Sequence, residues 1–93
     1  MFDWINKQGV KSNEGYVVQQ IHRFYFYYIE GERVLKVFVE PIKNGIEIIL
    51  EPRPKWEPPS SADQITEAKS VEIENRILDA LKFMGIKYTI KRK

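Results

Sequence analysis

The sequence predicts an α+β fold, a two-layer sandwich in which an antiparallel β-meander and a C-terminal strand pack on one long helix. Three patterns predict this fold. Residues 24–50 alternate apolar and polar side chains around two short turn sequences, residues 63–84 carry apolar side chains at helical spacing, and residues 86–90 alternate again. A chain of 93 residues has room for one hydrophobic core, so we expect a single domain over 1–93 in the order β-β-β-α-β.

The N-terminal part is the least regular. Residues 1–10 carry Phe2, Trp4 and Ile5, and we interpret them as a short turn or helical segment laid on the body, followed by a polar linker to residue 15. Residues 16–21 are rich in residues that favour strands. A bulge between them and Phe24 would make them an additional N-terminal strand.

Two turn sequences set the register of the meander. Gly31-Glu32 has the Gly-first order of a type II′ hairpin turn, which pairs Glu30 with Arg33, and Asn44-Gly45 suits a type I′ turn, which pairs Lys43 with Ile46. Both pairings place one set of apolar side chains on the same face, because side chains alternate with period two. That predicted core face consists of Phe24, Phe26, Tyr28, Leu35, Val37, Val39, Ile48 and Leu50.

A proline-rich crossover, residues 51–62, ends the third strand because proline cannot donate a ladder hydrogen bond. We expect its Trp56 to plug the end of the core; the alternative is that this segment is an extended ligand for an SH3 or WW domain. The helix is predicted over 63–84, capped by Ser61 or Asp63 and ended by Gly85.

The second face of the meander is unusually apolar for a solvated sheet. The predicted registers give it Tyr25, Tyr27, Ile29, Val34, Phe38 and Ile49, with Arg23, Lys36, Glu40 and Glu47 at the rim and Glu40 opposite Ile49. One helix can cover only one face, so this face is predicted to bind a partner, or a second copy in a two-fold dimer. The alternative is that the N-terminal segment folds over it.

Residues that commonly carry catalysis are scarce. The chain has no cysteine and one histidine, His22, which we interpret as an edge or packing residue. No Ser-His-acid arrangement and no glycine-rich phosphate loop is present. We therefore expect a protein that is not an enzyme and has no cofactor and no metal site.

The charge balance bears on partners. Fifteen Lys and Arg against thirteen Asp and Glu give a net charge of +2, which disfavours nucleic acid as a partner. A single-stranded nucleic-acid-binding module using the aromatic face is kept as the alternative function. No apolar run is long enough to span a membrane and the first residues lack a signal-peptide pattern, so we expect a cytoplasmic protein.

One set of motifs is more specific. The run Trp56-Glu57-Pro58-Pro59, then Ile65-Thr66, a helix with Ile73 and Ile77, and finally Gly85-Ile86-Lys87-Tyr88, resembles a small α+β family of predicted immunity proteins from bacterial polymorphic toxin systems. The resemblance implies a non-catalytic protein that neutralises a cognate toxin by protein–protein contact, with Trp56, Glu57 and Glu40 at the positions the family shares. The full set of expected partner-binding residues is Arg23, Tyr25, Tyr27, Lys36, Phe38, Glu40, Trp56 and Glu57.

Overall fold

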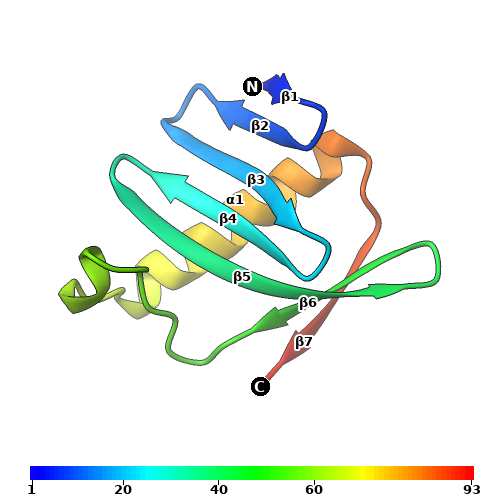
Figure 1. Cartoon of the computed structure of the whole chain (residues 1–93). Coiled ribbons are helices and arrows are strands. Elements are labelled where there is room, and N and C mark those ends of the chain that lie inside the picture. The colour runs from blue at the N-terminus through cyan, green and yellow to red at the C-terminus, as the bar shows by residue number, and fades with distance from the viewer.

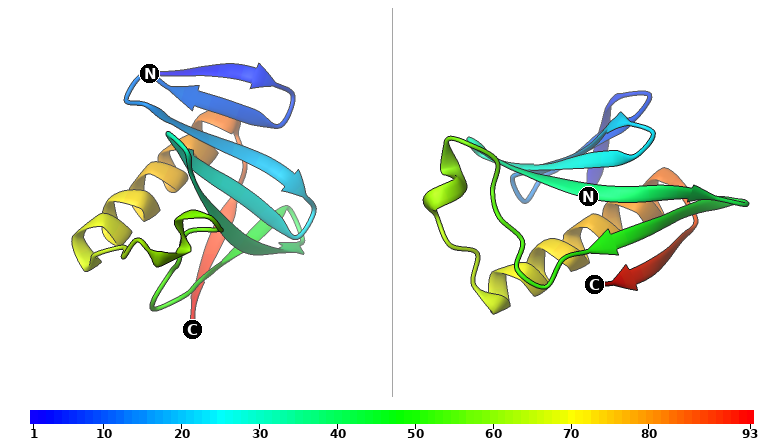
Figure 2. Two further views of the ribbon diagram at one scale, coloured as in Figure 1. Left: turned by 60° about the vertical axis from the view of Figure 1, so that its left-hand side comes forward. Right: turned by 60° about the horizontal axis from the view of Figure 1, so that its bottom comes forward.

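Seven strands in chain order form one sheet, and a single helix packs on one of its faces, in this computed structural model of residues 1–93 (Figures 1 and 2). The elements are β1 (Phe2–Asn6), β2 (Gly9–Ser12), β3 (Tyr16–His22), β4 (Tyr25–Glu30), β5 (Arg33–Ile42), β6 (Gly45–Leu50), α1 (Glu67–Met84) and β7 (Tyr88–Arg92). Neighbouring strands are antiparallel except β6 and β7, which are parallel. The α+β class is confirmed, and β3 is the additional strand considered at residues 16–21. The expected β-β-β-α-β order was still too short, since six strands precede the helix.

The β4–β5 hairpin has the predicted register. Glu30 pairs with Arg33 and Tyr28 pairs with Leu35. Gly31 has a φ of 63° while Glu32 is not among the residues with positive φ, which is the pattern of a type II′ turn.

The β5–β6 register was predicted wrongly, by two residues. Val39 pairs with Ile48 and Ile42 pairs with Gly45, so the turn residues are Lys43 and Asn44 instead of Asn44 and Gly45. Asn44 takes the left-handed conformation, with a φ of 68°. A shift of two leaves every side chain on its predicted face, because the side-chain period is also two.

The core lies between this sheet face and α1. Of the predicted core face, only Phe24 is wrong, since it lies exposed in the turn between β3 and β4; Leu50 is half-buried and the other six are buried. The remaining buried apolar residues are Val10, Tyr16, Val18, Trp56, Ile73, Ile77, Ala80 and Leu81.

The N-terminal segment was also predicted wrongly. Residues 2–12 form the β1–β2 hairpin, with part of the expected linker inside β2, and this hairpin extends the edge of the sheet. Phe2 and Trp4 lie on the helix side, with ring centroids 5.4 and 5.9 Å from that of Phe83 in α1. The segment therefore widens the sheet and does not cover its second face.

Helix α1 starts later than predicted. Its N-cap is Thr66, whose Oγ1 accepts a hydrogen bond from the backbone N–H of Lys69 at 3.1 Å. Of the two predicted caps, Ser61 lies in a separate 3₁₀ turn over Ser60–Ala62 and Asp63 ends that turn. The predicted end is confirmed: Gly85 is the C-cap, with a φ of 75°. The last strand, expected over 86–90, is β7 at 88–92.

Trp56 fills the core beside the crossover. It is 2% exposed, and its ring stacks on that of Tyr28 with centroids 6.3 Å apart. This confirms the interpretation of Trp56 as a plug at the end of the helix–sheet core.

A network of charged hydrogen bonds links α1 to the sheet. Glu30 Oε1 accepts hydrogen bonds from Tyr28 Oη at 2.6 Å, from Lys69 Nζ at 2.7 Å and from Arg76 at 3.0 Å. Burial opposes the charged form of Glu30, but the bonds from Lys69 and Tyr28 outweigh it and hold the pKa of Glu30 below its ordinary value. Burial and the bond to Glu30 raise the pKa of Tyr28, so its hydroxyl remains a donor.

We expect Glu30→Gln to lower the free energy of unfolding at pH 7 by about 1 to 2 kcal/mol, because charge-assisted hydrogen bonds from two elements are weakened. The folded-state pKa of Glu30 is lowered, so its stabilisation is present above the pKa of glutamate in the unfolded chain and is lost as the pH falls through the folded-state value. Urea denaturation should therefore show a difference between wild type and variant that shrinks below about pH 4. A difference that is constant from pH 7 to pH 3 would contradict this account. Glu32→Gln, an exposed change in the β4–β5 turn, is the control.

Candidate functional site

The sheet face opposite α1 has no element packed on it. In Figure 1 the helix lies behind the sheet, and both views of Figure 2 show it on that same side only. We call this uncovered surface the open face and define it by its apolar residues Val17, Tyr25, Tyr27, Ile29, Val34, Phe38 and Ile49. All are half-buried by their neighbours except Phe38, which is 45% exposed.

An aromatic row crosses the open face. Strand pairing aligns His22 with Tyr25, Tyr25 with Phe38, and Phe38 with Ile49 across four strands. The ring centroid of Tyr25 lies 5.4 Å from that of His22, 5.7 Å from that of Tyr27 and 6.4 Å from that of Phe38. Such rings are held by their neighbours, so little side-chain entropy is lost when a partner packs on them.

A single cation sits within this aromatic cluster. Lys36 Nζ lies 4.6 Å from the ring centroid of Tyr25 and 5.7 Å from that of Phe38, within cation–π range. It also lies 3.9 Å from Glu57 Oε1, at the edge of the ion-pair range. Lys36 therefore presents a positive charge that is only partly compensated, at the centre of an apolar surface.

The structure brings five of the eight expected partner-binding residues together: Tyr25, Tyr27, Lys36, Phe38 and Glu57. Arg23 lies at the rim, in the β3–β4 turn, with its guanidinium carbon 5.1 Å from the Phe24 ring centroid. Glu40 lies farther along β5 and faces Glu47, not Ile49 as expected. Trp56 is buried on the other side of the sheet and cannot contact a partner there.

Two open-face residues were not among the expected ones. Val17 lies there because β3 pairs with β4, and His22 stacks on Tyr25 because the chain reverses through Arg23 and Phe24. That turn contains no Gly, Asn or Pro, so no turn signal in the sequence could place His22 beside Tyr25.

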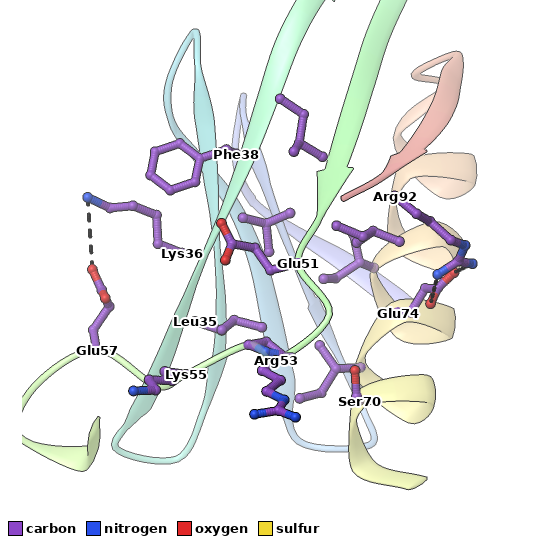
Figure 3. A pocket seen from close by; sticks show the side chains of 16 residues that line it. Leu35, Lys36, Phe38, Glu51, Arg53, Lys55, Glu57, Ser70, Glu74 and Arg92 are labelled. Carbon is purple, nitrogen blue, oxygen red and sulfur yellow. Dashed lines mark hydrogen bonds and ion pairs between the residues drawn. The ribbon is translucent and has the colours of Figure 1, made fainter. Parts of the chain in front are cut away.

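A cleft of about 440 Å³ adjoins the open face (Figure 3). It opens where β6 ends and the crossover leaves the sheet, and residues of β5, the crossover and α1 line it. Lys36, Phe38 and Ile49 belong both to the open face and to this cleft.

The structure holds no cluster of three or more His, Asp or Glu side chains arranged to bind a metal ion. No helix combines the length and apolar character that crossing a membrane requires. Comparison with family models, with curated proteins and with solved structures gave no match.

Proposed function

We propose that this protein is a non-catalytic binding protein that docks on a partner protein through the open face. The observation that carries the proposal is the contiguous surface of rings and β-branched side chains around Phe38, which the only helix cannot reach. Aromatic residues are enriched among the side chains that contribute most of the binding energy in protein interfaces. The rim charges Arg23, Glu40 and Glu47 can then set the orientation of the partner.

The sequence resemblance to predicted immunity proteins supports a specific form of this proposal: the partner is a cognate bacterial toxin, and binding neutralises it in the cytoplasm. The open face suits this role, because an inhibitor needs a surface that complements the partner and no catalytic groups of its own. Trp56, which the resemblance grouped with the shared positions, serves this function by holding the fold.

Co-expression with the product of the adjacent gene tests the proposal. We expect the neighbour alone to arrest growth and this protein to restore it, while a Tyr27→Glu/Phe38→Glu variant fails to restore it. A neighbour that is not toxic, or a rescue that the double variant performs equally well, would contradict toxin neutralisation through this face. Lys7→Glu/Lys43→Glu, a double change on exposed turn residues outside the open face, is the matched control.

The same face should support self-association when no partner is present. Sedimentation velocity at high micromolar concentration should show a two-fold dimer for the wild type and a folded monomer for Tyr27→Glu/Phe38→Glu. Neither side chain is in the buried core, so the free energy of unfolding should change by no more than about 1 kcal/mol. A wild type that sediments as a monomer would contradict self-association through this face. Unfolding of the variant would show that Tyr27 and Phe38 belong to the core.

A single-stranded nucleic acid is the alternative partner, since bases stack on exposed aromatic rings. Two features of the open face disfavour it: Glu57 lies beside the central Lys36, and Glu40 faces Glu47 at one end. A labelled oligonucleotide should therefore bind no tighter than about 100 μM at physiological salt, the range of non-specific binding.

A further inference from the structure

The cleft beside β5 results from a local separation of two strands. Pairing between β5 and β6 stops at Phe38 and Ile49, and the crossover then bows away from β5. The chain returns at Glu57, whose backbone N–H donates to the carbonyl oxygen of Val34 at 2.7 Å. The edge of β5 is therefore free for a short stretch centred on Lys36, and this free stretch is closed at both ends.

The backbone of Lys36 faces this gap. Val39 N–H donates to the Phe24 carbonyl oxygen at 2.9 Å, on the β4 side of β5. Successive residues of a strand direct their N–H and C=O groups to opposite edges, so those of Val34, Lys36 and Phe38 point the other way. On this edge Phe38 pairs with Ile49 and the carbonyl oxygen of Val34 accepts from Glu57, whereas no strand pairs with Lys36. The backbone N–H and C=O of Lys36 are thus available in the cleft, oriented as they would be for pairing with another strand.

The rest of the cleft combines an apolar floor with a positive edge. The floor is made by Val37, Leu50, Ile73 and Ile77 between sheet and helix. Each acidic side chain of the lining has a cationic partner. Glu57 has Lys36 at 3.9 Å and Glu74 has Arg92 at 2.6 Å (Figure 3), and Glu51 has Lys93 at 3.4 Å.

Arg53 and Lys55 of the crossover line the same cleft and form no ion pair. The cleft therefore has two positive charges that its own carboxylates do not neutralise. They favour an anionic ligand at this edge.

We propose that this cleft binds the C-terminal end of a peptide chain, with a free carboxylate and an apolar last side chain. The backbone amide of the last peptide residue forms hydrogen bonds with the free N–H and C=O of Lys36. The side chain of that residue packs on the apolar floor, and its carboxylate faces Arg53 and Lys55. A continuous strand cannot lie along this edge, because the gap is closed at Phe38–Ile49 and at Val34–Glu57, but a chain end can enter. The volume of about 440 Å³ is within the usual range of ligand pockets, roughly 300–1,000 Å³.

The test is a titration of the ¹⁵N-labelled full chain, followed by NMR, with acetyl-alanyl-leucine as the free acid. We expect a saturable shift of the Lys36 amide signal, with a Kd on the order of 1 mM for so small a ligand. The same dipeptide with a C-terminal amide should bind at least about ten-fold more weakly, since it lacks the carboxylate. No saturable shift at Lys36, or equal binding of the two forms, would overturn the proposal.

Two further arms separate the contributions. 4-Methylpentanoate carries the carboxylate and the apolar body without a peptide amide. If it bound as tightly as acetyl-alanyl-leucine, the peptide amide would contribute nothing, and the ligand of the cleft would be a simple apolar acid and not a peptide end. Arg53→Gln/Lys55→Gln should weaken the free acid about five-fold and leave the amidated form unchanged, whereas Lys7→Gln/Lys43→Gln, exposed lysines away from the cleft, should change neither. A five-fold loss in the control pair as well would show a general charge effect and contradict the site. These probes need no partner protein, so the outcome is independent of the function proposed for the open face.

Discussion

Replacing Trp56 with alanine is expected to lower the free energy of unfolding by about 4 kcal/mol, the largest single effect in this protein. Trp56 is 2% exposed and its ring stacks on Tyr28, so truncation leaves a cavity that the crossover can only partly fill. For a domain of this size that loss corresponds to a fall in Tm of about 20 °C. Circular dichroism during heating and urea denaturation would measure both quantities.

Trp4→Ala is the matched control for Trp56. Trp4 is the other tryptophan of the chain, but it is 50% exposed and contacts Phe83 at the edge of the sheet. Its truncation should cost about 1 kcal/mol. Equal losses from the two changes would contradict the assignment of Trp56 as the plug of the core. Trp56→Phe, which keeps a ring against Tyr28, should lie between them.

The parts of the fold that were predicted correctly depend on local patterns. The β4–β5 hairpin needs only a glycine-first turn and alternating side chains, and the end of α1 needs only Gly85 after an apolar stripe. The open face was also predicted, although the β5–β6 register was wrong, because a shift of two residues keeps every side chain on its face.

The parts that were predicted wrongly depend on contacts between distant residues. Phe2 and Trp4 lie in a strand because their rings pack on Phe83, which is near the other end of the chain. The β3–β4 turn, at Arg23-Phe24, contains none of the residues that usually mark a tight turn, while the β1–β2 turn at Lys7-Gln8 is marked only by the flanking Asn6 and Gly9. The composition of residues 16–21 was enough to indicate the strand β3, whereas residues 1–10 were interpreted as a turn or helical segment because no clear alternation marks β1 and β2.

The candidate sites show the same division. Alternation along β4 and β5 was enough to predict the aromatic face, since each side chain's face follows from its position in the strand. The cleft depends on where β6 stops pairing and on how far the crossover bows before Glu57 returns to Val34. Both are properties of the folded backbone, and proline-rich composition alone does not determine them.

Gly45→Ala is expected to have the second-largest effect, a loss of about 2 to 3 kcal/mol in the free energy of unfolding. The type I′ turn expected at Asn44-Gly45 would require positive φ at Gly45, but the φ of Gly45 is not positive. A Cβ atom at this position would instead lie 2.3 Å from the carbonyl oxygen of Lys87 and 2.9 Å from its carbonyl carbon. Both are backbone atoms, so the chain leading into β7 would have to move away from β6.

Hydrogen exchange distinguishes this cause from a turn effect. The Ile46 N–H donates to the Lys87 carbonyl oxygen at 3.0 Å, and Gly45→Ala should raise the exchange rate of this amide and of those along β7. Gly15→Ala is the control, because Gly15 has a φ of 96° and no atom within 4 Å of an added Cβ. That change should cost only the 1 to 2 kcal/mol of backbone strain, about the value for one left-handed residue, and leave β7 protected. An Ile46 amide that stays protected in Gly45→Ala would contradict this account. It would mean that β6 and β7 still pair when the Cβ atom is present, so the close approach of β7 would not explain the glycine.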